Sequence, residues 1–195
     1  TLISGCRESP APPGLTPHKK KLGKQMRKKE TLAGVAERIE AYDRFFQTAG
    51  YECPLPKHLK RTLASGFYKY SLLIDAHFLA EMCSGTLVAV ADFDRFEGAL
   101  RLDLAEEGER SLGMGARELV CRAGEIVLRD EKDIVCVLLQ GADEKTRVRP
   151  ETTSVCYYTY AVPGVGPEHL EQGLRIAAET ATRFGGGAVE VLEIY

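Results

Sequence analysis

The stretch from Ser71 to Asp94 constrains the fold most, because it places two apolar runs on either side of a short helical segment that ends at a glycine. Residues 72–74 form the first run, and residues 86–91 (TLVAVA) have the composition of a fully buried strand. The chain before this stretch has helical and basic patterns, whereas the chain after it has short strand patterns. We therefore predict that residues 71–94 form the hinge of the fold and one wall of its functional site.

The N-terminal part of the chain divides into a polar lead and two helical segments. Residues 1–17 are rich in proline, glycine and serine, and residues 18–30 (HKKKLGKQMRKKE) are rich in lysine and arginine. We predict that residues 1–30 form a flexible segment, with a short edge strand at residues 2–3, and that residues 31–195 form a single domain. Apolar residues recur at helical spacing over residues 31–49, and residues 57–66 predict a second short helix with a basic face.

The rest of the chain has strand patterns, followed by one helix and a last strand. The helix begins at Pro167 and ends at the three glycines 185–187, and the last strand covers residues 188–194. This order predicts an α+β fold with N-terminal helices, a mainly antiparallel mixed β region and a C-terminal helix plus strand, rather than a doubly wound sheet. The strand patterns lie at residues 99–104, 118–121, 125–129, 134–139 and 152–162.

Composition excludes several classes of protein. The chain has 195 residues, which fits one domain, and a formal net charge of -2, so it is not a polycation as a whole. No apolar run is long enough to span a membrane and no signal peptide is evident, so we expect a cytoplasmic monomer without a membrane partner. The six cysteines are scattered without metal-ligand spacing, which predicts reduced core thiols rather than disulfides or a zinc site. We expect neither a metal nor a cofactor.

Asp75 and His77 form the first polar cluster that could support chemistry. We predict that Asp75 is the N-cap of a helix over residues 76–83, so that His77 shares the start of this helix. The free backbone amides of a helix start favour an anion or a polarised carbonyl oxygen. A plain helix cap and a half-buried histidine explain these two residues equally well.

The second polar cluster follows the predicted strand at residues 134–139. Gly141 lets the backbone approach a ligand closely. The neutral side chains around it provide hydrogen-bond donors and acceptors but no strong base, so the cluster suits positioning a water better than forming a covalent intermediate. A polar loop with threonine turns is the alternative. The neutral residues are Gln140, Thr146, Thr152 and Thr153.

Three runs of sequence, at residues 72–109, 124–143 and 146–153, resemble the B3/B4 domain. This is the editing domain of the bacterial phenylalanyl-tRNA synthetase beta subunit, and it also occurs as a free-standing protein. The similarity lies in the order and spacing of an apolar pair with Asp75, a short helix that ends in glycine, an acidic turn, a hairpin and a Thr-Thr strand. It covers roughly residues 70–162.

The resemblance implies hydrolysis of a wrongly charged aminoacyl-tRNA by a positioned water. It assigns catalytic roles to Asp75, His77 and Gln140. Four positions depart from the family: Ala89 replaces a histidine, Phe78 replaces an asparagine, Gln140-Gly141 replaces a Gly-Gly turn, and Tyr158 stands where a glutamate recognises a tyrosine hydroxyl. The amino-acid pocket is therefore predicted to be altered. The predicted pocket residues are Phe78, Ala89, Gly141, Thr146, Thr152, Thr153 and Tyr158.

The leading hypothesis is a deacylase that acts in trans on mischarged tRNA. Clustered lysine and arginine side chains gain affinity for a nucleic acid by releasing its counterions, although a solvated charge run explains residues 18–30 equally well. The alternatives are a non-catalytic module that binds RNA, an amino acid or a protein, and, as a weaker reading, a small-molecule esterase or amidase. The predicted tRNA contacts are Lys19, Lys20, Lys21, Lys24, Arg27, Lys28, Lys29, Lys57, Lys60 and Arg61.

Overall fold

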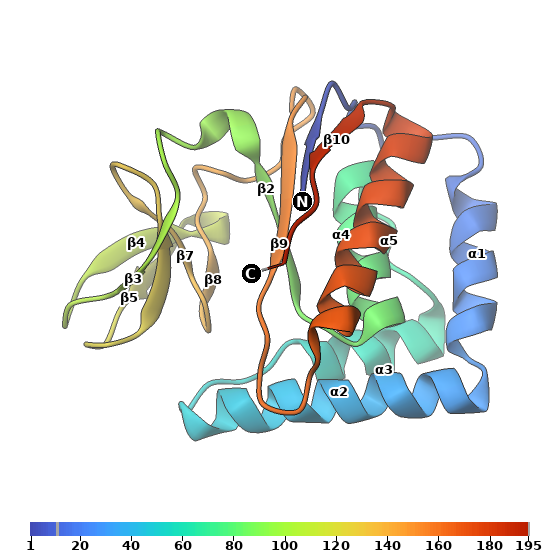
Figure 1. The fold of residues 1–195 in the computed structure, drawn as a ribbon, viewed down its shortest axis with the longest axis horizontal. Coiled ribbons are helices and arrows are strands. Elements are labelled where there is room, and N and C mark those ends of the chain that lie inside the picture. Colours follow the sequence, from blue (N-terminus) through green and yellow to red (C-terminus); the bar gives the residue numbers. More distant parts are fainter. Residues whose placement is uncertain (11, 195) are drawn as a thin grey trace.

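The computed structural model describes residues 1–10 and 12–194, and its centre is a four-stranded sheet covered by two helices (Figure 1). Helices α4 (Leu72–Ser84) and α5 (Pro167–Gly185) pack against each other and against this sheet. The strand order is β10-β1-β9-β2, and all neighbours are antiparallel. The strands are β1 (Leu2–Ser4), β2 (Val88–Asp92), β9 (Val155–Thr159) and β10 (Ala188–Val191).

Three further helices pack against α4. Helix α1 (Leu15–Met26) stands beside α4, and α2 (Lys29–Thr48) runs along the lower edge in Figure 1, next to α3 (Leu55–Ser65). The apolar stripe predicted on α2 is buried as expected. It forms a second core with α3, α4 and the segment before α5.

A separate β unit lies on the far side of β2, at the left of Figure 1. Its main sheet has the order β3-β6-β7-β8, and β4 and β5 form a two-stranded ribbon, all antiparallel. Leu119, Val127, Ile134 and Val137 belong to its own small core. The elements are β3 (Arg101–Leu104), β4 (Arg110–Gly113), β5 (Arg117–Val120), β6 (Ile126–Arg129), β7 (Ile134–Val137) and β8 (Gly141–Ala142), with 3₁₀ turns at Phe93–Arg95 and Met114–Ala116.

The structure confirms the α+β class and corrects two details of the prediction. Helix α4 begins at Leu72, four residues earlier than predicted, because Leu72 and Leu73 pack into the core from its first turn. Strand β1 is an inner strand, between β10 and β9, rather than an edge strand. Residues 1–30 contain β1, α1 and the first residues of α2.

The three glycines after α5 let β10 approach β1. Gly187 has a φ of 86°, a conformation that L side chains rarely adopt. A Cβ atom at this position would lie 2.3 Å from the carbonyl oxygen of Ser4, so any side chain would push the two strands apart. Close backbone packing therefore explains the glycine at position 187.

Three expectations from the sequence concern membrane-spanning helices, the cysteines and metal ligands. Among residues 1–10 and 12–194, no helix is long and apolar enough to cross a membrane. All six cysteines carry free thiols, and four of them are buried. In the same residues, no group of three or more histidine, cysteine or acidic side chains is arranged to hold a metal ion.

Asp130 fixes the hairpin between β6 and β7. Its buried carboxylate accepts hydrogen bonds from the backbone of Lys132 (2.9 Å), Asp133 (2.7 Å) and Glu97 (3.0 Å), and from Nζ of Lys145 (2.8 Å). Burial disfavours its charge, but Lys145 and the backbone donors outweigh burial and hold the pKa of Asp130 far below its ordinary value of 3.8.

We expect Asp130→Asn to lower the free energy of unfolding by about 2–4 kcal/mol at neutral pH, because Lys145 loses a buried charged partner. A lowered pKa in the folded state stabilises the protein above the ordinary value of 3.8, and this contribution is lost as the pH falls further. The wild type and the variant should therefore converge in acid. Urea denaturation of both proteins at neutral and acidic pH measures this, and a difference that stays constant with pH would contradict it.

Candidate functional site

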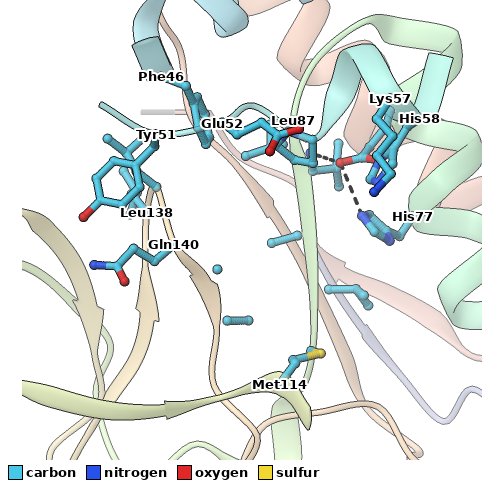
Figure 2. A pocket seen from close by; sticks show the side chains of 18 of the residues that line it. Phe46, Tyr51, Glu52, Lys57, His58, His77, Leu87, Met114, Leu138 and Gln140 are labelled. Atoms are coloured by element: carbon cyan, nitrogen blue, oxygen red, sulfur yellow. Dashed lines mark hydrogen bonds and ion pairs between the residues drawn. The ribbon is translucent and has the colours of Figure 1, made fainter. Parts of the chain in front are cut away.

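A cavity of about 700 Å³ lies between the helical layer and the β unit. Side chains of α3, α4 and β2 line one side, and the segment from Leu138 to Ala142, with Met114 and Arg117, lines the other. In Figure 2, His58 and His77 lie on one side of this space, and Tyr51, Leu138 and Gln140 lie on the opposite side. The cavity thus forms where the two parts of the fold meet.

Glu81 is the central charged group of this cavity. It is only 1% exposed, and it lies on α4 one turn after His77. Its Oε2 lies 3.1 Å from Nδ1 of His58, and its Oε1 lies 3.4 Å from Nε2 of His77 and accepts the backbone N–H of Val88 at 3.4 Å (Figure 2). One buried carboxylate therefore holds two imidazole rings against the cavity.

The two histidines keep Glu81 charged. Burial by itself would raise the pKa of this carboxyl, but the charge of His77 and the hydrogen bonds from His58 and His77 outweigh burial, so the pKa of Glu81 lies below its ordinary value. An ionised Glu81 accepts hydrogen bonds only. The neutral forms of both rings must therefore place their proton on the nitrogen that faces Glu81.

The second ring nitrogens of the two histidines differ in access. Nδ1 of His77 is buried and has no hydrogen-bond partner among the described residues. The side chain of His58 is 20% exposed and lines the cavity. With Nδ1 protonated toward Glu81, Nε2 of His58 is an acceptor that a water in the cavity can reach. Of the two rings, His58 is therefore the one placed to act as a base.

The opposite wall is held by hydrogen bonds within the β unit. The side-chain amide of Gln140 donates to the carbonyl of Val120 at 3.1 Å and to Glu125 at 2.9 Å. The guanidinium of Arg117 donates to the backbone carbonyl of Gln140 at 2.6 Å. Gly141 follows with a φ of 115°, a backbone conformation that favours glycine. These hydrogen bonds fix the position of the polar groups on this wall.

The structure brings several of the predicted site residues together. His77, Ala89, Gln140, Gly141 and Lys57 all line the cavity, although they come from four different segments of the chain. The ring of Phe78 lies beside the cavity, with its centroid 4.4 Å from that of His77 and 5.1 Å from that of His58. Phe78 therefore supports both imidazole rings by packing.

Asp75 does not line this cavity, and it lies inside α4 rather than at the predicted N-cap position, which Ser71 occupies. It is 2% exposed within the first turns of α4, and its carboxylate pairs with the ammonium of Lys19 and accepts the backbone N–H of Tyr70 at 3.0 Å. Lys19 is itself buried and also donates to the carbonyl of Tyr68 at 2.7 Å. The predicted catalytic aspartate and the first predicted tRNA contact thus form one buried ion pair that joins α1 to α4.

The predicted threonines also lie outside the cavity. Thr146 donates to Asp143, Thr152 donates to Asp92 at 2.7 Å, and Thr153 donates to Asp94 at 3.2 Å. These bonds stabilise the turns that lead from the β unit back to β9. Tyr158 on β9 is half-buried beside Cys136, and burial of its hydroxyl raises its pKa well above the ordinary value of 10.

The remaining predicted tRNA contacts lie on the surfaces of α1, α2 and α3. Arg61 is half-buried, with its guanidinium carbon 3.9 Å above the ring of Tyr68. Tyr68 stacks on Phe78 at 4.2 Å and on Tyr70 at 5.5 Å, and Tyr70 is 57% exposed. The exposed basic residues are Lys20, Lys21, Lys24, Arg27, Lys28, Lys29, Lys57 and Lys60.

Sequence reasoning did not identify Glu81 and His58 as site residues. A signal for Glu81 existed, because His77 and Glu81 are four residues apart on a helix and such pairs face each other. No local pattern indicates His58, since it reaches Glu81 from a different helix, 23 residues away in the chain. Its basic neighbours Lys57 and Lys60 suggested a surface residue.

Comparison with known proteins gives a distant structural similarity. No family model matches the sequence, and no curated protein matches it. An N-terminal fragment of the phenylalanyl-tRNA synthetase beta-subunit from Pyrococcus horikoshii is similar over 59% of this chain and 40% of that chain, with a TM-score of 0.47 and 17% sequence identity. The chain therefore spans about two fifths of the length of that fragment, and the chemistry of the site rests on its own residues.

Proposed function

We propose that the cavity hydrolyses the ester bond of mischarged aminoacyl-tRNA, and that the protein acts in trans in the cytoplasm. The observation that carries this proposal is the buried Glu81 carboxylate, which orients His58 toward a cavity large enough for an aminoacyl group. The sequence resemblance to the B3/B4 editing domain supports the substrate class. The exposed lysines of α1, α2 and α3 support an RNA partner.

The proposed chemistry is attack of a water on the ester carbonyl. Nε2 of His58 takes a proton from the water as its oxygen bonds to the carbonyl carbon, and Glu81 stabilises the imidazolium that forms. The carbon–oxygen bond to the ribose then breaks, and Nε2 of the His58 imidazolium returns its proton to the ribose oxygen as it leaves. The products are a free amino acid and uncharged tRNA. His77 acts as a positioning residue through Glu81.

The apolar and the charged side chains that line the cavity have different proposed roles. The apolar side chains of Leu87, Val90 and Leu138 face the amino-acid side chain. Lys57 and Arg117 provide positive charge for the phosphates next to the ester. Because Ala89 and Phe78 stand where the family has polar residues, we propose an amino acid other than tyrosine.

A panel of mischarged tRNAs, incubated with the purified protein, tests this function. We expect at least one of them to lose its amino acid about 100-fold faster than in buffer, which is the lower range for general base catalysis. Correctly charged phenylalanyl-tRNA and a small aryl ester are the controls. If no charged tRNA is hydrolysed faster than in buffer, the proposal fails, and turnover of the aryl ester alone would indicate a small-molecule esterase.

A non-catalytic RNA-binding module is the second candidate, and the aromatic stack favours it. The exposed ring of Tyr70 continues the stack of Tyr68 and Phe78, and Arg61 lies over Tyr68. Nucleic acid bases stack on such exposed rings without a need for chemistry. Salt-dependent tRNA binding with no deacylation in the panel would select this candidate.

A further inference from the structure

A second cavity, of about 390 Å³, lies between α1, the C-terminal end of α3 and the loop that follows α3. Helix α3 connects the two cavities, because its first turn provides Lys57 and His58 to the large cavity and its last turns provide Thr62 and Ser65 to this one. None of the residues that carry the proposed hydrolysis lines the second cavity. It is therefore a distinct site.

The walls of this second cavity carry positive charge only. Lys20 and Lys24 on α1, together with Lys69 in the loop after α3, line it and are exposed to solvent. Within the described part of the chain, no acidic side chain lines the cavity and none of these three lysines has an ion-pair partner. The buried ammonium of Lys19 is neutralised beneath them by Asp75. This charge pattern favours an anion with more than one negative charge.

Thr62 provides a buried hydroxyl without a partner. Its side chain is 1% exposed and lines the cavity, and Oγ1 has no hydrogen-bond partner among the described residues. A buried hydroxyl that stays unsatisfied is costly, so such groups are normally bonded to protein, water or ligand. Thr62 therefore adds an unsatisfied hydroxyl to a cavity wall that also carries three unpaired lysines.

The C-terminal end of α3 would repel an anion if its carbonyls were free. Arg27 removes this obstacle, because its guanidinium donates to the carbonyls of Thr62 and Leu63, both at 2.9 Å. The N–H of Gly66 also caps the carbonyl of Thr62 at 2.9 Å. The partial negative charge of the helix end is thereby covered by a cation.

The floor of the cavity is apolar. Met26 and Phe67 are buried and line it, and Gly23 lies beside the phenylalanine ring. A Cβ atom at Gly23 would lie 3.2 Å from Cε2 of Phe67, so the glycine leaves space over the ring, although glycine inside a helix is unfavourable. An apolar floor below charged walls suits a ligand with an apolar body and one charged group.

We propose that this cavity binds an organic phosphate monoester, with its phosphate on Lys20, Lys24, Lys69 and the Thr62 hydroxyl and its apolar body on Phe67. A phosphate monoester fits better than a carboxylate, because it carries nearly two negative charges and three acceptor oxygens. Such a group occurs in free nucleotides and at the 5′ end of RNA. The site does not depend on the proposed hydrolysis, since it shares no lining residue with the large cavity.

Isothermal titration calorimetry of the full chain at low, fixed salt tests the proposal. The probes are adenosine 5′-monophosphate, inorganic phosphate, adenosine, and a short RNA with a 5′-phosphate or a 5′-hydroxyl. We expect adenosine 5′-monophosphate to bind at least 10-fold more tightly than either adenosine or inorganic phosphate. Preference for the 5′-phosphorylated RNA over the nucleotide would assign the site to RNA ends, and the reverse order would assign it to free nucleotides.

Thr62→Val is the decisive variant. Valine has the shape of threonine without the hydroxyl, so we expect at least 10-fold weaker binding with an unchanged or higher melting temperature. Lys20→Gln with Lys24→Gln should also weaken binding about 10-fold, whereas Lys132→Gln, a change of the same type in the β unit, should not. Binding that is equal for Thr62→Val and wild type, or no binding of any phosphate, overturns the proposal and leaves a water as the partner of the hydroxyl.

Discussion

Glu81→Gln is expected to slow hydrolysis of the ester about 100- to 10,000-fold, the range for loss of a general base. The amide oxygen must accept the N–H of Val88, which places the amide NH₂ group against Nδ1 of His58. Nδ1 then has to accept a hydrogen bond, so the proton moves to Nε2, where the base is needed. The variant keeps the shape of the site and leaves His58 in the wrong tautomer.

Single-turnover rates on the tRNA that is hydrolysed in the panel measure this effect. His58→Gln should lower the rate by a similar factor, and the double variant should lose little more, because the two residues act as one unit. Glu40→Gln, an exposed change of the same chemistry on α2, is the matched control and should retain the wild-type rate. Effects of Glu81→Gln and His58→Gln that multiply in the double variant would show that the two residues do not act together.

Asp75→Ala is expected to lower the free energy of unfolding by about 3–5 kcal/mol, because it leaves the ammonium of Lys19 buried and unpaired. It also removes the acceptor for the backbone N–H of Tyr70. The loss should appear as a lower denaturation midpoint in urea, and the fraction that remains folded should hydrolyse the ester at nearly the wild-type rate.

The double variant Lys19→Met with Asp75→Leu separates stability from catalysis. Replacing both charges with apolar groups of similar size removes the unpaired charge, so the double variant should regain most of the stability that either single change loses. It should also keep its activity, because Asp75 lies outside the cavity. A variant with restored stability but no hydrolysis would show instead that Asp75 takes part in the reaction.

The fold was predictable where local patterns carry the information. Apolar residues at helical spacing indicated α2 and α5, and Gly85 ended α4 where its φ of 75° places it in the left-handed region. The start of α4 was predicted too late, because an apolar run at a helix start resembles the end of a buried strand. The inner position of β1 was not predictable from three residues, since strand order depends on the pairing of distant segments.

The candidate site was predictable only in part. His77 was chosen because it is a polar residue beside an apolar run, and Gln140 and Gly141 were chosen because they form a turn after a predicted strand. All three line one cavity. Asp75 was chosen by the same reasoning, but it lies outside the cavity. Its carboxylate forms a buried ion pair with Lys19. The chemical character of a carboxylate depends on the groups packed around it, which the local sequence does not record.

By itself, the sequence determined the α+β class, the order of the elements and the buried faces, because these follow from the short-range periodicity of apolar residues. Only the tertiary structure decided which charges meet. It paired Lys19 with Asp75 across 56 residues, and it placed Glu81 between His58 and His77. Periodicity fixes which face of each helix is buried, whereas a buried carboxylate becomes an ion pair or a catalytic partner according to which helix packs against it.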